Sequence, residues 1–209
     1  MAAGRDVRSV TLLAVTKGQS VAQIRAALAL GLDQFGENYV GEALDKIHAL
    51  RDTPAQWHFI GRLQANKTRS VAESFAWVHS VDRLRIAERL AAQRPPQAPA
   101  LNVCVQVHIA DDPEKGGVAP DQALPLLRAI SALPRLHLRG LMCILPYETA
   151  ADGQHAAFAR LRQLLEAGHQ AGLVLDTLSM GMSADMDTAI AEGATIVRVG
   201  TALFGLRDP

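Results

Sequence analysis

Cysteine is scarce in this chain of 209 residues, which has only Cys104 and Cys143. Both lie inside apolar segments, NVCVQV and LMCIL, so we expect buried thiols in a reducing compartment, not a disulfide or a metal site. No apolar run is long enough to span a membrane, and the start MAAGRDVRSV lacks the apolar core of a secretion signal. We therefore expect a cytoplasmic protein that does not enter a membrane.

The sequence also lacks an excess of charge of either sign, since Lys and Arg together number 21 and so do Asp and Glu. Nucleic acids and anionic membranes are bound by strongly basic surfaces, so we expect neither as the main partner. A local basic cluster, NKTRS at 66–70, has no interleaved aromatic residues to stack on bases. We interpret this cluster as a solvated helix start.

Several motifs of common catalytic sites are missing. The seven histidines show no ligand spacing such as H-E-x-x-H, and we expect no metal. The chain has no G-x-S-x-G, no P-loop and no G-x-G-x-x-G after a strand. These absences argue against a metallopeptidase, a serine hydrolase, a P-loop nucleotidase and a dinucleotide-binding enzyme.

What the chain does have is a regular alternation of short β-rich runs with longer segments of helical spacing, punctuated by Gly and Pro. Seven helices are expected between the strands, including a polar helix at 64–74, the longest helix at about 152–171 and a short helix from Ser183. The eight expected strands cover 10–16, 33–37, 57–61, 76–81, 101–109, 136–144, 175–180 and 194–200.

Strict alternation of strands and helices implies a parallel sheet, and eight units predict a (β/α)8 TIM barrel near the short limit of that fold. The alternative is an open doubly wound sheet. The strand count and the missing dinucleotide motif favour the barrel. We expect one domain that covers residues 1–209.

In such a barrel the functional groups lie at the carboxyl ends of the strands. The first expected strand is followed by Lys17, and the turn after the second offers Glu37 and Asn38. The third strand carries His58, which alternates with the apolar residues of WHFIG. A structural histidine with satisfied hydrogen bonds is favoured there over a catalytic base.

The last two strands are followed by similar turns, in SMGMSAD and RVGTALFG. Gly181 and Gly200 allow a ligand to approach the backbone, while Ser183 and Thr201 supply hydroxyl groups. Free N–H groups at a helix start attract anions, and barrels often bind phosphate after strands 7 and 8. Each turn alone fits an ordinary helix start, but the pair predicts a phosphate site without a basic side chain.

Two basic residues keep more than one interpretation when only the residues are considered. Lys17 is a surface side chain just past a strand, a partner of Glu37 or another acid, or a Schiff-base lysine in a dry pocket. Spacing alone favours the surface side chain. Arg198, in the apolar strand IVRVG, is either a member of a structural ion pair or a donor aimed at a ligand.

Six segments carry a resemblance to a known family: LLAVTK, FGENYV, WHFIGRLQANK, LRGLM, LSMGMSADM and VRVGTALFG. In this order they strongly resemble the pyridoxal 5′-phosphate (PLP) homeostasis proteins, from about Val10 to Asp208. The resemblance implies the fold type III barrel, which also forms the N-terminal domain of alanine racemase. PLP needs a lysine for its aldehyde, a phosphate cradle and a partner for its ring nitrogen.

The resemblance also implies roles for individual residues. Lys17 matches the lysine that forms the internal aldimine with PLP, and Arg198 matches the arginine near the pyridine nitrogen. The remaining cofactor-binding positions are Ser183, Gly200 and Thr201 at the phosphate, Asn38 along the cofactor, and Met180 and His58 in the pocket.

The family implies a carrier of PLP with little or no catalytic turnover, a monomer that serves PLP-requiring apo-enzymes. A guanidinium beside the pyridine nitrogen disfavours ring protonation, and an unprotonated ring is a poor electron sink. The alternative function is a PLP-dependent amino-acid racemase-like enzyme. A Schiff-base aldolase with a phosphate site agrees less well with the complete set of motifs.

The chain departs from the family pattern at several places. A long helix usually precedes the first strand, whereas here about ten residues do, and we expect most of that helix to be lacking. Thr16 and Gly18 flank the lysine where Ser and Thr are common. EKGGV follows strand 5 where Lys-Ser-Gly is usual, and CILPYE follows strand 6. These changes predict a different local shape of the rim and an uncovered side of the barrel.

Overall fold

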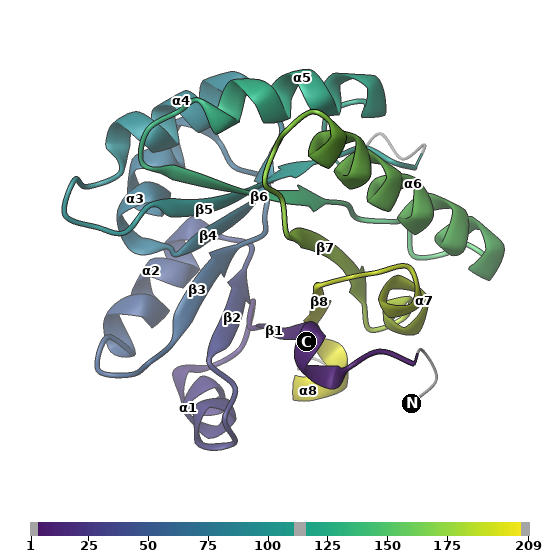
Figure 1. Cartoon of the computed structure of the whole chain (residues 1–209). Helices are drawn as coiled ribbons and strands as arrows, with labels where there is room; N and C mark the ends of the chain where they lie inside the picture. Colours follow the sequence, from purple (N-terminus) through teal and green to yellow (C-terminus); the bar gives the residue numbers. More distant parts are fainter. Residues whose placement is uncertain (1–3, 111–115, 206–209) are drawn as a thin grey trace.

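The computed structural model describes residues 4–110 and 116–205, and its strands form a closed barrel in chain order (Figure 1). Every strand pairs in parallel with the next, and β8 closes on β1, with Thr11 opposite Ile196. The (β/α)8 fold is thus confirmed, and the open doubly wound sheet is wrong. The strands are β1 (Thr11–Val15), β2 (Gln34–Glu37), β3 (Gln56–Phe59), β4 (Trp77–Val81), β5 (Leu101–Gln106), β6 (Leu136–Met142), β7 (Thr177–Met182) and β8 (Ile196–Val199).

The helices surround the barrel (Figure 1). No helix of the described ranges is long and apolar enough to cross a membrane. The α-helices are α1 (Val21–Ala29), α2 (Val40–Ala49), α3 (Thr68–Ser74), α4 (Leu84–Gln93), α5 (Pro120–Ser131), α6 (Ala151–Gln170), α7 (Met186–Ala191) and α8 (Thr201–Phe204); two short 3-10 helices are η1 (Val7–Ser9) and η2 (Ala65–Lys67).

Local sequence explains where the first helix begins and ends. Ser20 caps α1: its Oγ accepts the Gln23 N–H at 3.3 Å, and its own N–H donates to Gln23 Oε1 at 2.8 Å. This reciprocal capping box satisfies amide groups that the first helical turn leaves unpaired. Gly31 follows the helix with φ +88°, a conformation that glycine adopts at little cost. The turn therefore returns the chain to the barrel at β2.

The helix after β7 begins later than predicted. The helix after β7 begins at Met186 and not at Ser183, because the Asp185 carboxylate accepts the Met182 N–H at 2.5 Å and closes a turn first. In the described ranges seven α-helices, α1 to α7, lie between the strands, as predicted, and the four-residue α8 follows β8. The unusual loop ADDPEKGGVAP after β5 lies partly outside the described residues, at 111–115.

Two apolar clusters form the core. The larger one lies between the strands and the helices, and the smaller one fills the inside of the barrel. Both cysteines are free and buried, as predicted, and burial raises the pKa of each thiol to about 12. The smaller cluster consists of Leu13, Ile60, Trp77, Cys104, Met142 and Ile196.

The described segment before β1 contains one short 3-10 helix, η1. Its anchor is Arg5, whose Nη1 donates to the carbonyl oxygens of Ala194 at 2.6 Å and Ile190 at 3.2 Å. Within the described residues, this side of the barrel therefore has η1 and the short α8 where the other strands have longer helices.

Candidate functional site

Most of the predicted site residues lie at the carboxyl edge of the barrel. Four adjacent strands, β7, β8, β1 and β2, end there in barrel order. Ser183 follows β7, Thr201 follows β8, Lys17 follows β1 and Asn38 follows β2. Parallel strands present their carboxyl ends at one end of the barrel, which is where TIM-barrel enzymes place their active sites. The structure thus brings these four residues to one arc of the edge.

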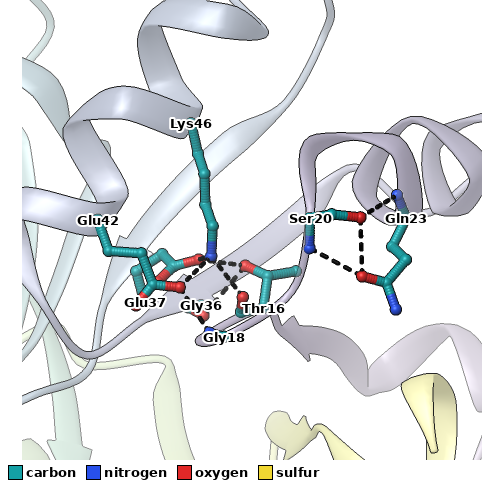
Figure 2. A network of polar contacts seen from close by, with 8 residues as sticks. All are labelled: Thr16, Gly18, Ser20, Gln23, Gly36, Glu37, Glu42 and Lys46. Carbon is teal, nitrogen blue, oxygen red and sulfur yellow. Dashed lines mark hydrogen bonds and ion pairs between the residues drawn. The ribbon is translucent and has the colours of Figure 1, made fainter. Parts of the chain in front are cut away.

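Lys17 is half-buried, and a polar network surrounds the backbone on both sides of it (Figure 2). The Nζ atom of Lys46, on α2, donates to the Thr16 carbonyl oxygen at 2.6 Å and to Glu37 Oε1 at 2.7 Å. The Thr16 hydroxyl also donates to Glu37 Oε1, at 2.7 Å. Glu37, one of the partners that the sequence suggested for Lys17, is thus bound by Lys46.

Glu42 completes this network from the same helix. Its Oε1 accepts the Gly18 N–H at 2.5 Å and the Lys46 ammonium at 2.5 Å. Glu37 is fully buried, and burial raises the pKa of its carboxyl group, against the opposing effects of Lys46 and Thr16. The second carboxyl oxygen, Oε2, has no hydrogen-bond partner among the described residues.

Asn38 offers a second buried oxygen without a partner. Its Oδ1 has no hydrogen-bond donor in the described part of the chain, although the atom is shielded from solvent. Buried polar atoms in folded proteins are nearly always hydrogen-bonded, so an orphaned one at a functional edge fits contact with a polar ligand. Asn38 directly follows β2, and β2 is the neighbour of β1, the strand that precedes Lys17.

The two turns predicted to bind phosphate have their polar groups exposed. Within the described ranges, the amide groups of Ser183 and Thr201 donate to no protein acceptor, and both residues face solvent. Gly181 has φ +94°, and a Cβ there would lie 2.5 Å from Ala189 Cβ, so close packing against α7 explains this glycine. A Cβ on Gly200 would make only ordinary contacts with Val15.

Arg198 points into the barrel from β8. Its Nη1 donates to the carbonyl oxygen of Ser179 at 2.7 Å and to the Ser179 hydroxyl at 2.9 Å, and its Nη2 donates to the Cys143 carbonyl oxygen at 2.8 Å. Burial lowers the pKa of Arg198, yet arginine keeps its charge in proteins. Arg198 forms no ion pair with any described residue, so the structural ion pair that the sequence suggested is wrong.

A chain of hydrogen bonds continues from Arg198 through the barrel. Ser179 Oγ lies 2.7 Å from His79 Nδ1, and His79 Nε2 lies 2.9 Å from His58 Nδ1. His58 Nε2 lies 2.9 Å from Gln34 Oε1. The Gln34 amide nitrogen donates to the Asp33 carboxylate at 2.9 Å, which leaves its oxygen to accept from His58.

This pattern fixes the direction of every bond. His58 donates through Nε2–H, so its Nδ1 accepts from His79 Nε2–H, and His79 Nδ1 accepts from the Ser179 hydroxyl. Burial lowers the pKa of His58 to about 3 and the pKa of His79 well below its usual value. Both histidines are therefore neutral, and the chain holds Arg198 without adding charge.

His58 and Met180 are not brought to the arc with Lys17. The His58 ring has partners at both nitrogens and lines a cavity of about 460 Å³ at the amino ends of the strands. The Met180 side chain is buried in the apolar cluster between the barrel and the helices. That cavity is lined by Thr11, Asp33, Gln34, Gln56, His58, Trp77, Asn102, Arg139 and Ile196.

Sequence reasoning missed four residues that support the site: Glu42, Lys46, His79 and Ser179. A polar residue inside an apolar strand, as in WVHSV and LSM, is a signal that could have indicated the last two. Lys46 stands outside the apolar stripe of its helix, where a lysine is ordinarily solvated. The structure instead buries it with 7% of its side chain exposed.

Comparisons with known proteins agree with this geometry. The family model described as "Alanine racemase, N-terminal domain" matches residues 4–208. The pyridoxal phosphate homeostasis protein of Pseudomonas aeruginosa is 56% identical over 99% of this chain and 89% of its own length. Its counterpart in Escherichia coli K12 is 48% identical over 98% of this chain and 89% of its own length.

A solved structure gives the same result in three dimensions. PipY of Synechococcus elongatus, with PLP bound, superposes with a TM-score of 0.89 at 42% identity, over 94% of this chain and 93% of PipY. Sequence identity at this level across nearly the whole chain, together with the matching barrel, shows common family membership. This chain belongs to the family of pyridoxal phosphate homeostasis proteins, whose barrel is the alanine racemase N-terminal domain.

Proposed function

We propose that this chain binds PLP through a Schiff base on Lys17 and serves intracellular PLP homeostasis, with little or no catalytic turnover. The observation that carries the proposal is the arc at the carboxyl edge, where Lys17 lies between Asn38 on one side and the turns at Thr201 and Ser183 on the other. The names of the relatives and the PLP bound to PipY support the same cofactor.

The covalent step requires an uncharged amine at Lys17. Its Nζ attacks the aldehyde carbon, a carbon–nitrogen double bond forms, and the aldehyde oxygen leaves as water. Ser183 and Thr201 would hold the phosphate through amide and hydroxyl donors, with Gly200 leaving room for it. Asn38 Oδ1 would accept a hydrogen bond from the cofactor, which accounts for its missing protein partner.

The position of Arg198 favours binding over turnover. When bound, PLP supplies an electron sink to amino-acid chemistry, and that property depends on a protonated ring nitrogen. The Arg198 guanidinium is fixed by three protein oxygens and carries its charge at the base of the arc. A cation held beside the ring nitrogen disfavours its protonation through like-charge repulsion. The resemblance also implied that His58 and Met180 contact the cofactor. In this proposal these two residues lie behind the arc and act through packing.

A titration with PLP tests the proposal. The wild-type chain is expected to develop the absorbance of a protonated Schiff base, and Lys17→Ala is expected not to. Lys67→Ala is the matched control, because Lys67 is an exposed lysine of η2, in the loop after β3 and outside the arc formed after β7, β8, β1 and β2. A wild-type spectrum that equals the sum of free protein and free PLP would contradict the proposal.

Delivery to PLP-requiring apo-enzymes by a monomer is the finer part of the proposal. Ser183 and Thr201 are exposed and Lys17 is half-buried, so the arc is open to solvent. The PLP-loaded chain is mixed with an apo-enzyme in the presence of a scavenger of PLP such as phosphatase. The rate at which the apo-enzyme regains activity should exceed the rate at which the scavenger removes PLP. If these two rates are equal, the chain stores PLP but does not deliver it to the apo-enzyme. Light scattering gives the oligomeric state in the same samples.

The alanine racemase family model makes a racemase-like enzyme the second candidate. Incubation of the PLP-loaded chain with amino acids in deuterated water distinguishes the two. Exchange at the α-carbon would favour the enzyme, and its absence across the common amino acids would favour the carrier.

A further inference from the structure

We propose that Glu42 and Lys46 of α2 form a clamp that sets the conformation of Lys17 for its reaction with PLP. They are positioning residues, since they act on the backbone beside Lys17. The inference rests on the proposed function of Lys17. We refer to these two side chains and their contacts with Thr16 and Gly18 as the Lys17 clamp.

The clamp holds both peptide groups that flank Lys17 (Figure 2). The preceding peptide is held at its carbonyl oxygen, on Thr16, by the Lys46 ammonium at 2.6 Å. The following peptide is held at its N–H, on Gly18, by the Glu42 carboxylate at 2.5 Å. The backbone has two soft dihedrals per residue, and fixing both flanking peptide planes fixes both dihedrals of Lys17.

The clamp is itself anchored to the barrel. Lys46 binds Glu37, the last residue of β2, and Glu42 is bound to Lys46 one helical turn away. Hydrogen bonds to charged groups are about twice as strong as those between neutral groups. Gly18 adopts the left-handed conformation, with φ +74°, at little cost, and the Gln19 N–H closes the turn by donating to the Thr16 carbonyl oxygen at 2.9 Å. The direction in which the Lys17 side chain leaves the backbone is thus held by α2 together with this turn.

A purely structural ion pair would not explain this arrangement. Burying an ion pair is often no more stabilising than packing two apolar side chains in its place. Here three bonds of the network end on residues adjacent to Lys17: at the Thr16 carbonyl, the Thr16 hydroxyl and the Gly18 amide. Covalent chemistry needs a lysine amine held at a defined place, and small displacements cost reaction rate.

Glu42 is the residue to change, because 32% of its side chain is exposed and its replacement leaves the buried Lys46–Glu37 pair intact. Glu42→Gln keeps an oxygen that accepts the Gly18 N–H, whereas Glu42→Leu removes it. Glu73→Leu is the matched control: Glu73 forms an exposed pair with Arg69 at the same i, i+4 spacing on α3.

Two measurements are made on each variant. The first is the hydrogen exchange rate of the Gly18 amide by NMR without PLP. We expect Glu42→Leu to speed this exchange by about tenfold or more, as for loss of a hydrogen bond to a charged group. The second is the rate of Schiff-base formation with PLP, which we expect to fall by about tenfold in Glu42→Leu. Glu42→Gln should stay within about threefold of wild type in both, and Glu73→Leu should match wild type.

The outcomes separate this inference from the proposed function. If PLP reacts equally fast with wild type, Glu42→Leu and Glu73→Leu, the clamp is wrong and the proposed function stands. A Gly18 amide that exchanges in wild type as fast as a free peptide also overturns the clamp. A wild-type chain that forms no Schiff base contradicts the proposed function and removes the reaction that the clamp would serve.

Discussion

The barrel contains two buried polar networks that differ in charge. Beside Lys17, the ammonium of Lys46 is bound by the carboxylates of Glu37 and Glu42. Behind Arg198, the bonds run through Ser179 and two neutral histidines to Gln34. The first network holds peptide groups at the edge, and the second holds one side chain deep inside.

The difference follows from what each network holds. A turn at the barrel edge, with its backbone groups partly exposed, is fixed by strong, charge-assisted bonds. Arg198 already carries a charge, and a second charge nearby would either neutralise or repel it. Neutral histidines supply donors and acceptors without that effect. The charged network should therefore be sensitive to the loss of one partner, and the neutral one should be sensitive to acid.

The largest effect is expected from breaking the charged network. Lys46→Met leaves the fully buried Glu37 without its cation, and we expect the free energy of unfolding to fall by about 3–5 kcal/mol. Adding Glu37→Leu removes the unpaired acid and should recover most of the loss. Urea unfolding measures both variants. Equal stability of the single and the double variant would contradict this account.

A smaller loss is expected from breaking the neutral network. His79→Phe leaves His58 Nδ1 without a donor and the Ser179 hydroxyl without an acceptor. No charge is stranded, so we expect a loss of about 1–3 kcal/mol in the same urea experiment. A loss as large as that of Lys46→Met would show that charge does not distinguish the two networks.

The pH dependence of stability separates them further. Burial lowers the pKa of His58 from 6.5 to about 3 and lowers that of His79 as well, so the unfolded chain binds protons that the folded chain does not. This stabilisation is complete above pH 6.5 and is lost on acidification towards pH 3, by about 1.4 kcal/mol per pH unit for each histidine. Urea unfolding between pH 6 and 5 should show a slope smaller by about that amount in His79→Phe. Parallel slopes would contradict the neutral state of His79.

The smallest effect is expected at an exposed ion pair. Glu73→Gln disrupts the pair with Arg69, whose side chains are 46% and 67% exposed, and should change stability by less than about 0.5 kcal/mol. This change in stability is the reference for the loss expected at the buried Lys46–Glu37 pair. A loss of several kcal/mol here would mean that burial is not the reason for the large effect at Lys46.

The sequence predicted the barrel because apolar runs such as VTLLAVT, bounded by Gly and Pro, repeat eight times. It predicted that Lys17 follows a strand for the same reason. It did not predict the burial of Lys46, because a lysine outside an apolar stripe is normally solvated. Nor could it pair His79 of β4 with Ser179 of β7, since a contact across the barrel depends on the closed sheet and not on spacing along the chain.

The most direct test of the account is to locate the PLP attachment. The chain is loaded with PLP, reduced with borohydride, digested and examined by mass spectrometry. The account predicts that the pyridoxyl group is found on the peptide that contains Lys17 and is lost in Lys17→Ala, with Lys46 unmodified because the clamp buries it. A pyridoxyl group found on Lys46 or on surface lysines, and not on Lys17, would contradict it.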